Sequence, residues 1–399
     1  MAGAGQPFYM PLTWPIGHVS SAIMKPDDDE PRAPSATPEL DMIGHVTSMI
    51  AACRSFAMAY MCIFLFYGSG DAAYPAFGRA KEYDVQWMLP IVLRNVVATW
   101  LIAGLWDWFL YFSPLAKKLH KYKLNKRYPA FSQMRHDAIA TTIASICGAA
   151  VEIVLCHYWA TGQLAGAIGA NGAQRPLFGG DGTHKTWVSV AWMLTCTHWR
   201  VPHFYVVHRM MHPWKNRYGP DVGAFLYTWV HKQHHKSHNP TAFSGTNMHP
   251  VEAVLYYSAA LIPCAFGAHP AIAVACIIDC AVGAWLGHDG FQWPGSGDYF
   301  HQLHHAHFDC NYGAMHFPID KWFGTFADSG KMVRQIWSDH KDGGGAKANG
   351  VHEPTLVANH ARATASPRRT GPATQRDGTP LRRSVRRSGR KKSGEIVVH

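Results

Sequence analysis

Long apolar runs separated by short polar connections dominate the chain, and they predict membrane-spanning helices. The runs that are long enough to cross a bilayer as a helix cover about 44–67, 87–113, 138–160 and 187–207. A further apolar stretch, about 251–287, is broken by Pro263 and by His269-Pro270, which predicts a tight hairpin or a re-entrant pair. The pattern therefore predicts an all-α integral membrane protein with four to six transmembrane helices.

Ionisable residues interrupt these runs, and at membrane depth such residues are expected to face the interior of a helix bundle. Arg54, Arg94, Glu152 and the group of His198, Arg200 and His203 are the examples. The connections between the runs favour one orientation: 114–137 holds seven Lys and Arg, whereas 161–186 holds two. Because basic connections stay on the cytosolic side, we expect both termini in the cytosol.

Outside these runs the pattern changes. Residues 1–40 are rich in Pro and Asp, without the basic-then-apolar layout of a cleavable signal, and predict a disordered N-terminal segment. Residues 331–399 lack periodicity and predict a disordered basic tail. Between them we expect N-terminal transmembrane helices at 41–186 and a catalytic domain at 187–330. Within that domain the aromatic segment 213–230 is too short to span and predicts an interfacial helix.

Three histidine clusters stand near the ends of apolar runs. Their members are His208 and His212, then His231, His234 and His235, then His301, His304 and His305. On a helix, a spacing of three or four residues places imidazoles on one face, so three such faces can converge in one cage. We expect this cage in a cytosolic helical cap.

The number of histidines indicates two metal ions. A structural zinc site takes four ligands, usually including cysteine, whereas the clusters alone offer eight histidines. Imidazole suits iron, zinc and copper alike, so the spacing does not choose the metal. None of the nine cysteines forms a CxxC pair. Those in apolar segments are expected to be small buried side chains, namely Cys62, Cys147, Cys156, Cys264, Cys276 and Cys280.

Composition and charge agree with a membrane protein. The chain is 48% hydrophobic and only 16% charged, and its net charge of +11 is concentrated in the tail, where 361–399 holds eleven Lys and Arg against two acidic residues. The tail is interpreted as a lipid headgroup contact, a sorting element or a solvated segment. Nucleic acid is not an expected partner of a multi-pass protein.

The histidine clusters and their surroundings resemble the fatty acid hydroxylase/sterol desaturase superfamily of membrane di-iron enzymes, and in particular its sterol C-5 desaturase-like branch. The similarity covers about 198–330. The runs that carry it are His203–Arg209, Asn239-Pro240, Met248–Glu252, Gly287–Gly290, Gly297–His301, Asn311–Gly313 and Asp320–Phe326.

The resemblance implies two further ligands, His249 in a His-Pro element and His288 after the membrane hairpin. The implied metal ligands are then His208, His212, His231, His234, His235, His249, His288, His301, His304 and His305. No catalytic residue beyond them is expected. The implied cofactors are two iron ions, which zinc can replace in purified protein, together with O2. His238 and His307 are weaker candidates that would orient ligands.

This chain departs from many relatives at Val201, where they carry an acidic residue that could orient a ligand. His203 and Glu252 are the candidates to replace it. Trp192, Trp199, Phe204 and Trp285 are candidates to line a lipid-facing slot.

By this resemblance the function is O2-dependent hydroxylation or desaturation of a sterol, fatty acyl or sphingoid lipid, in lipid and sterol biosynthesis at the endoplasmic reticulum. The chain shows neither a dinucleotide-binding G-x-G-x-x-G element nor the haem-binding element of cytochrome b5. Electrons would therefore come from an external donor such as cytochrome b5 or a ferredoxin, for which the basic 114–137 connection offers a docking surface.

Two alternatives stay open. One is a non-enzymatic membrane metal-binding protein. The other is a different di-iron oxidation, such as aldehyde decarbonylation or carotenoid hydroxylation.

Overall fold

The computed structural model describes residues 80–125, 128–168, 175, 177–214, 219–237, 239–292, 298–314 and 317–328, together with Cys53, 56–58 and Met61. The predicted segments 1–40 and 331–399 and most of the run 44–67 lie outside these residues. The chain divides into two compact units, Met1–His340 and Lys341–His399, and every described residue belongs to the first.

All regular structure in the described residues is helical. The α-helices are α2 (Val85–Thr99), α3 (Leu105–Asp107), α4 (Ala116–Leu119), α5 (Phe131–Ala160), α6 (Thr186–Leu194), α7 (Cys196–Met210), α8 (Val222–Trp229), α9 (Pro250–Tyr257), α10 (Leu261–Ala265), α11 (Pro270–Leu286), α12 (Asp298–His307) and α13 (Ile319–Trp322). Short 3-10 helices cover His120–Tyr122, Gly182–His184, His231–Lys236 (η7), Ala242–Thr246 and Ser258–Ala260.

The first long helix begins at Asp84, whose side chain accepts a hydrogen bond from the Gln86 amide at 2.8 Å and so caps the free N–H groups of the first turn. Two π-helical turns, Trp100–Gly104 and Trp108–Phe112, carry it through α3 without a break. The resulting apolar helix, Val85–Phe112, has 28 residues. At 1.5 Å per residue it is about 42 Å long, which exceeds the roughly 30 Å hydrocarbon core of a bilayer.

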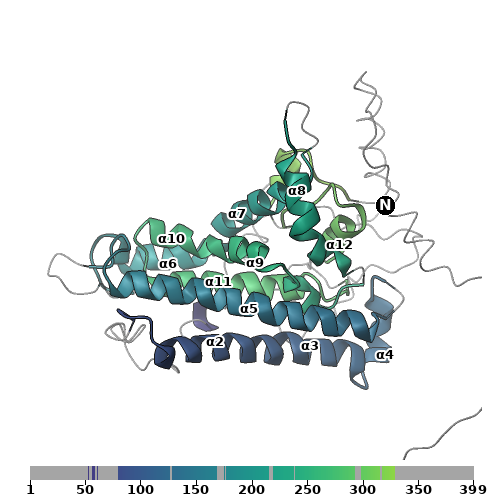
Figure 1. Cartoon of the computed structure of the whole chain (residues 1–399), viewed down its shortest axis with the longest axis horizontal. Coiled ribbons are helices and arrows are strands. Elements are labelled where there is room, and N and C mark those ends of the chain that lie inside the picture. The colour runs from purple at the N-terminus through teal and green to yellow at the C-terminus, as the bar shows by residue number, and fades with distance from the viewer. Residues whose placement is uncertain are drawn as a thin grey trace, which may run out of the picture. The chain divides into compact units, whose positions relative to one another are not determined.

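The second long helix, α5, lies beside α2 (Figure 1). Its 30 residues are also apolar enough to cross a membrane. Close packing against α9 relies on Gly148, because a Cβ there would lie only 3.2 Å from the Tyr257 ring. The helices predicted at 87–113 and 138–160 are thus confirmed as helices of sufficient length and apolarity.

The run 187–207 does not form the single helix that its composition predicted. It divides at Thr195 into α6 and α7, and α6, with nine residues, is too short to span a bilayer. The Thr195 hydroxyl donates to the Ala191 carbonyl at 2.7 Å. This side-chain bond competes with the regular backbone ladder at the point where α6 ends.

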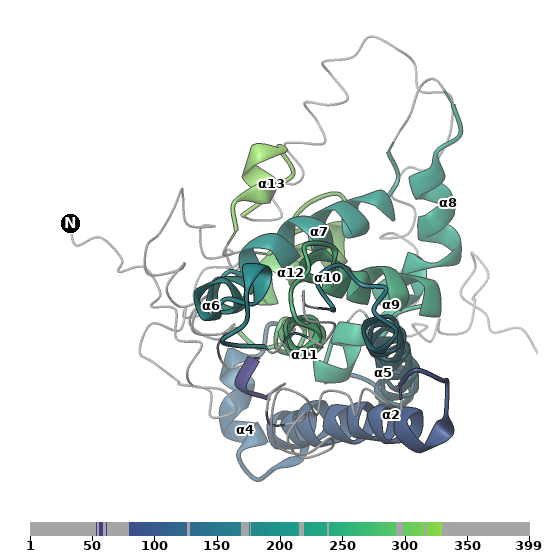
Figure 2. The same ribbon diagram turned by 90° about the vertical axis from the view of Figure 1, so that its left-hand side faces the viewer.

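The stretch 251–287 forms the expected hairpin. Its first arm runs from α9 through the 3-10 turn Ser258–Ala260 into α10, and its second arm is α11. The turn between them contains Gly267, which has a φ of +74°, and His269, which caps α11 by accepting from the Ala271 amide at 3.1 Å. In the end-on view α2 lies beneath α5 and α11, and α7 lies on the other side of α11 (Figure 2).

Buried ion pairs hold the helices together. Arg94 of α2 pairs with Glu152 of α5, and Arg200 of α7 pairs with Asp279 of α11 at 2.6 Å. All four side chains are buried, as predicted for Arg94, Glu152 and Arg200. Removing one member of such a pair strands the other charge away from water, which typically costs about 3–5 kcal/mol.

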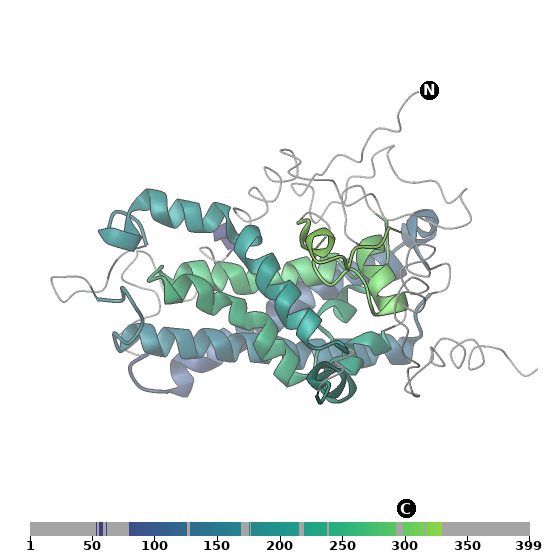
Figure 3. The ribbon, with the colours of Figure 1, turned by 90° about the horizontal axis from the view of Figure 1, so that it is seen from above.

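The histidine clusters gather at one end of this bundle. The C-terminal end of α7, with α8 and α12, lies over the end of the long helices at which α4 is found (Figure 1). From above, the segment 298–328, drawn in yellow-green, covers only that part of the long helices (Figure 3). We call α7, α8, η7 and α12 together the cap.

Candidate metal centre

Nine of the ten predicted ligands come together in two adjoining groups. The first group consists of His208, His212, His231, His235 and His304, and the second of His234, His288, His301 and His305. Within each group, one nitrogen of every ring lies within 4.8 Å of those of the others, and all nine side chains are buried.

Two elements supply ligands to both groups. In η7, His231 and His235 point into the first group and His234 into the second. In α12, His304 belongs to the first group, whereas His301 and His305 belong to the second. In the first group, His208 lies in the last turn of α7 and His212 follows that helix. In the second group, His288 follows α11. A shift of η7 or α12 would therefore disturb both groups.

The spacing of ring nitrogens in the first group suits a shared metal ion. His235 Nε2 lies 3.0 Å from His231 Nε2 and 3.3 Å from His212 Nε2, and His208 Nε2 lies 3.2 Å from His231 Nε2. At metal–nitrogen distances of 2.0–2.1 Å, neighbouring ligand nitrogens around one ion are about 2.9–3.4 Å apart. The observed separations fall in that range.

The second group has the same spacing. His288 Nε2 lies 3.3 Å from His234 Nε2 and 3.1 Å from His305 Nε2. The two groups also touch, since the rings of His235 and His305 have centroids 4.8 Å apart. The arrangement therefore offers two adjacent metal positions.

Hydrogen bonds fix which nitrogen of several rings faces the metal position. Four rings donate a hydrogen bond through Nδ1–H, each at 2.7 Å. His231 donates to Glu252 Oε1. The other three donate to backbone carbonyls: His208 to Tyr312, His288 to Ala284 and His304 to Cys310. A neutral ring that donates through Nδ1 keeps its lone pair on Nε2. Partners of this kind commonly orient metal-binding histidines.

Some ring nitrogens have no partner in the described part of the chain. His301 Nε2 and His304 Nε2 are both buried, and neither makes a hydrogen bond there. A buried polar atom without a partner typically costs about 1–3 kcal/mol, and a metal ion bound to it would remove that cost. Imidazole is a good ligand for iron, zinc or copper, so these residues fit a pair of such ions.

Burial keeps the rings uncharged. Loss of water lowers the pKa of His231 to about 3, and the same cause lowers the pKa of His288 to about 4. Burial first, and then the charge of neighbouring rings, also holds the pKa of His212 and His305 well below 6.5. Neutral imidazole is the form that binds a metal ion.

His249 is the one predicted ligand that the structure does not bring to the others. It caps α9, where its Nδ1 accepts from the Val251 amide at 3.2 Å, and it is only half-buried. Glu252, in the first turn of the same helix, reaches the site instead, because it accepts the hydrogen bond from His231.

Val201 lies fully buried among apolar side chains. Of the two candidates to replace the missing acidic residue, Glu252 therefore contacts a ligand, whereas His203 bonds to Ser258.

The turn after α12 contributes residues that the spacing of histidines did not indicate. The ring of Tyr312 packs against His208, His212 and His304, with centroids 5.7, 5.0 and 5.3 Å apart. Phe308 has a φ of +66°, in the left-handed region, and its ring lies 4.8 Å from that of His235. These aromatic rings keep water from the first group.

Asn311 and Asp320 hold that turn in place. Asn311, with a φ of +56°, donates to the Phe300 and Ala327 carbonyls at 3.0 and 2.9 Å. The Asp320 carboxylate accepts from the amides of Tyr312 and Gly313 at 2.8 Å each. The runs Asn311–Gly313 and Asp320–Phe326, noted above for their resemblance, are the sequence signal that could have identified this turn.

Residues from the first long helix hold the turn after His288. Trp106 Nε1 donates to Asp289 Oδ2 at 3.0 Å, and the Tyr111 hydroxyl donates to the Asp289 carbonyl at 2.7 Å. Gly290, with a φ of +82°, allows this close approach, because a Cβ there would lie 2.7 Å from both the Pro240 carbonyl oxygen and the Tyr111 hydroxyl. A small cleft lined by Pro240, Gly290, His288, His301, His305 and Gln302 borders the second group here.

The other candidates occupy varied positions. His307 is half-buried at the end of α12, and His238 lies outside the described residues. Phe204 stacks on the ring of His208 with centroids 5.1 Å apart, whereas Trp285 is buried and donates to Thr246. Phe204 thus contacts one of the predicted ligands directly.

Comparison with known proteins agrees with this geometry. Residues 193–325 match the model of a family described as fatty acid hydroxylase. This family and the relative described below both fall in the fatty acid hydroxylase/sterol desaturase superfamily. The superfamily resemblance predicted from the sequence is therefore confirmed, and it supports a lipid oxidase.

A Dictyostelium discoideum protein provisionally described as a methylsterol monooxygenase is 28% identical over 142 residues. The match covers 31% of this chain and 46% of that relative, so the chain spans about half of the relative's length. No solved structure matches the chain.

Replacing His304 and His249 separately would test the ligand assignment. We expect His304→Ala to lower metal affinity by more than about 100-fold, because it removes a ligand itself rather than a supporting partner. We expect His249→Asn to keep full metal content, since asparagine also caps a helix N-terminus well. Metal analysis of both purified variants checks this, and equal losses in the two would contradict the assignment.

Acidification should destabilise the metal-free protein. The unfolded chain takes up protons on these histidines below pH 6.5, whereas the folded rings resist protonation until about pH 4 for His288 and about pH 3 for His231. Stability is therefore fully present above pH 6.5 and falls as the pH is lowered through this window. Thermal unfolding between pH 8 and 5 measures the effect, and a melting temperature that rose on acidification would refute it.

Proposed function

We propose that the protein is a membrane-bound di-iron oxidoreductase that uses O2 to hydroxylate or desaturate a lipid. The observation that carries this proposal is the pair of adjoining groups of buried, neutral imidazoles within a segment that matches the fatty acid hydroxylase family. The nine histidines of the two groups, with no cysteine among them, exceed the four ligands that a structural zinc site takes.

The bound iron ions would supply O2 activation and the removal of hydrogen from an unactivated C–H bond. The chain's own residues hold and orient the ions. Glu252 and three backbone carbonyls accept the Nδ1–H groups of four ligands and so direct their Nε2 atoms inward. Tyr312 and Phe308 cover the first group and exclude water from it.

The surface of the first long helix favours contact with lipid. Only 22% of its most apolar window is buried inside the protein, whereas the core helix of a soluble protein would be mostly buried. Its exposed apolar side chains include Leu93, Val97, Leu101, Leu105 and Trp108. Such a continuous apolar face is typical of a membrane-facing surface. We infer a multi-pass protein in which α2–α3 and α5 cross the bilayer and the α9–α11 hairpin enters it.

The cap would lie on the cytosolic side, with the endoplasmic reticulum as the expected membrane. Exposed Lys117, Lys118 and Lys121 stand at the same end of the long helices as the cap, in agreement with the positive-inside rule. The exposed apolar side chains of α8, Phe225 and Trp229, are suited to the interface between headgroups and acyl chains.

Among lipid substrates, a methylsterol is the first to test. The described relative is named for monooxygenation of such a substrate, which favours hydroxylation over desaturation and a sterol over an acyl chain. A non-enzymatic metal-binding role is the competing proposal. Consumption of O2 by the iron-loaded protein in the presence of a reductant and lipid separates the two.

Lipid mass spectrometry tests the reaction directly. Cells expressing the wild type or His304→Ala would be extracted for sterols and acyl lipids together. We expect a species specific to the wild type that is heavier by one oxygen for hydroxylation or lighter by two hydrogens for desaturation. If iron is bound and a donor is present but neither species forms, the oxidase proposal fails.

The external electron donor would dock on the basic connection after the first long helix. The segment that follows Lys121 pairs with the turn after His288: the Leu124 amide donates to the Gly290 carbonyl at 3.0 Å, and the Gln292 amide to the Tyr122 carbonyl at 2.9 Å. A donor bound at α4 would thus be near the second histidine group. An acidic protein such as cytochrome b5 or a ferredoxin fits the charge of this surface.

Charge reversal tests this docking surface. We expect the triple variant Lys117→Glu, Lys118→Glu and Lys121→Glu to raise the KM for the donor about tenfold at low salt, because electrostatic steering is lost. Turnover driven by a small chemical reductant would stay unchanged. Donor kinetics identical to those of the wild type would place docking elsewhere.

A further inference from the structure

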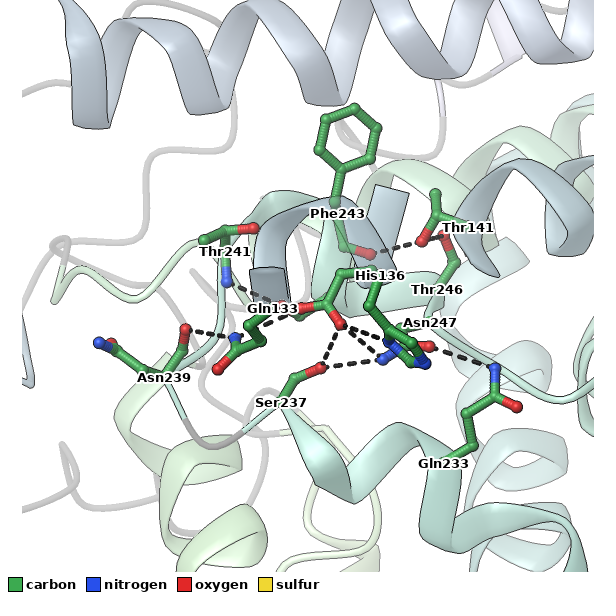
Figure 4. Close-up of polar contacts among 12 residues, drawn as sticks. Gln133, His136, Thr141, Gln233, Ser237, Asn239, Thr241, Phe243, Thr246 and Asn247 are labelled. Atoms are coloured by element: carbon green, nitrogen blue, oxygen red, sulfur yellow. Dashed lines mark hydrogen bonds and ion pairs between the residues drawn. The ribbon is translucent and has the colours of Figure 1, made fainter. Parts of the chain in front are cut away.

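A buried carboxylate on α5 lies against the loop that follows the second histidine cluster. Asp137 is fully buried and belongs to the second turn of α5, well outside the matched segment 193–325. The loop facing it, 237–247, connects η7 to α9 (Figure 4). None of the ligand assignments above involves Asp137.

Asp137 accepts hydrogen bonds from both ends of that loop. Its Oδ1 accepts from the Ser237 hydroxyl at 2.9 Å and from Asn247 Nδ2 at 2.8 Å, and its Oδ2 accepts from the Ser244 hydroxyl at 2.7 Å. Ser237 follows η7 directly, and Asn247 stands two residues before the cap of α9. The Asp137 side chain therefore binds both the residue that follows η7 and a residue shortly before α9.

A second path reaches the histidine turn itself. Gln233 lies in η7 between His231 and His234, and its Nε2 donates to Asn247 Oδ1 at 3.3 Å. Asn247 thus links the carboxylate of Asp137 to the middle of η7, as the dashed contacts among Ser237, Asn247 and Gln233 show (Figure 4). Through this link and through Ser237, the position of η7 depends on α5.

A neighbouring carboxylate provides a useful contrast. Asp107 accepts from the amides of Ala242 and Phe243 at 2.7 and 3.3 Å, in the middle of the loop. These two bonds do not reach η7 or Asn247. Asp137, in contrast, attaches both Ser237, which follows η7, and Asn247 to α5.

We propose that Asp137 is a positioning residue that fixes η7 and thereby sets the metal affinity of both histidine groups. η7 contributes His231 and His235 to the first group and His234 to the second, and a functional site requires its ligands to be held within about 0.5 Å. This inference rests on the proposed metal-binding function, but it concerns a residue that touches neither metal position.

Anaerobic titration of metal-free, full-length protein in detergent with ferrous iron tests the proposal. We expect Asp137→Asn to weaken binding in both groups by about 10–100-fold, as loss of a supporting partner typically does. Exchanging the two side chains, Asp137→Asn with Asn247→Asp, returns a carboxylate to the same cluster and should recover most of that affinity. Ser145→Ala is the matched control, because Ser145 is buried on the same helix and bonds to Thr99 of α2 instead of the loop.

The outcomes separate this proposal from the one on which it rests. If the wild type binds no iron, the proposed function fails. If the wild type binds two ions and Asp137→Asn binds them as tightly, or the exchanged variant is folded but no better than the single one, the positioning role is overturned. Should Asp137→Asn not fold, Ser237→Ala removes only one of the bonds. Unchanged affinity in that folded variant would equally overturn the proposal, whereas a several-fold loss supports it.

Discussion

Nine imidazole rings are buried in one place, and the arrangement of the cap follows from their burial. Each ring has two polar nitrogens, and a buried nitrogen without a partner is costly. In four rings Glu252 or a backbone carbonyl accepts a hydrogen bond from Nδ1–H, the nitrogen that points away from the other rings. On the inner side the nitrogens face one another at 3.0–3.3 Å, a spacing that metal ions would satisfy. The cap is therefore organised around nitrogen atoms that could hold metal ions.

The long helices do more than present an apolar surface. Their ends nearest the cap bear Asp107, Asp137 and Tyr111, each of which bonds to a loop that leads to or from a histidine. Fixing a loop to a rigid helix reduces the motion of the ligands beside it. The apolar faces and the polar ends of the same helices thus serve two separate requirements, contact with the surroundings and support of the metal centre.

Sequence reasoning predicted local features well and long-range ones less well. The three clusters follow from spacing within one element, and the structure brings all eight of their members together. His288 needed a resemblance, because nothing local marks a lone histidine. His249 and Glu252 lie within one turn of the same helix start, and the sequence alone cannot tell which of them points toward His231. Tyr312 and Asp137 act across more than 100 residues of sequence, a distance at which spacing carries no information.

Two backbone hydrogen bonds join the segment after the first long helix to the turn after His288, one between Leu124 and Gly290 and one between Gln292 and Tyr122. The edge of the metal centre is completed by chain that lies some 70 residues upstream of the segment shared with the family. That segment is accordingly not a portable unit. Grafting it onto unrelated helices would leave the turn after His288 and the loop after η7 without their supports, so the segment depends on the N-terminal helices of its own chain.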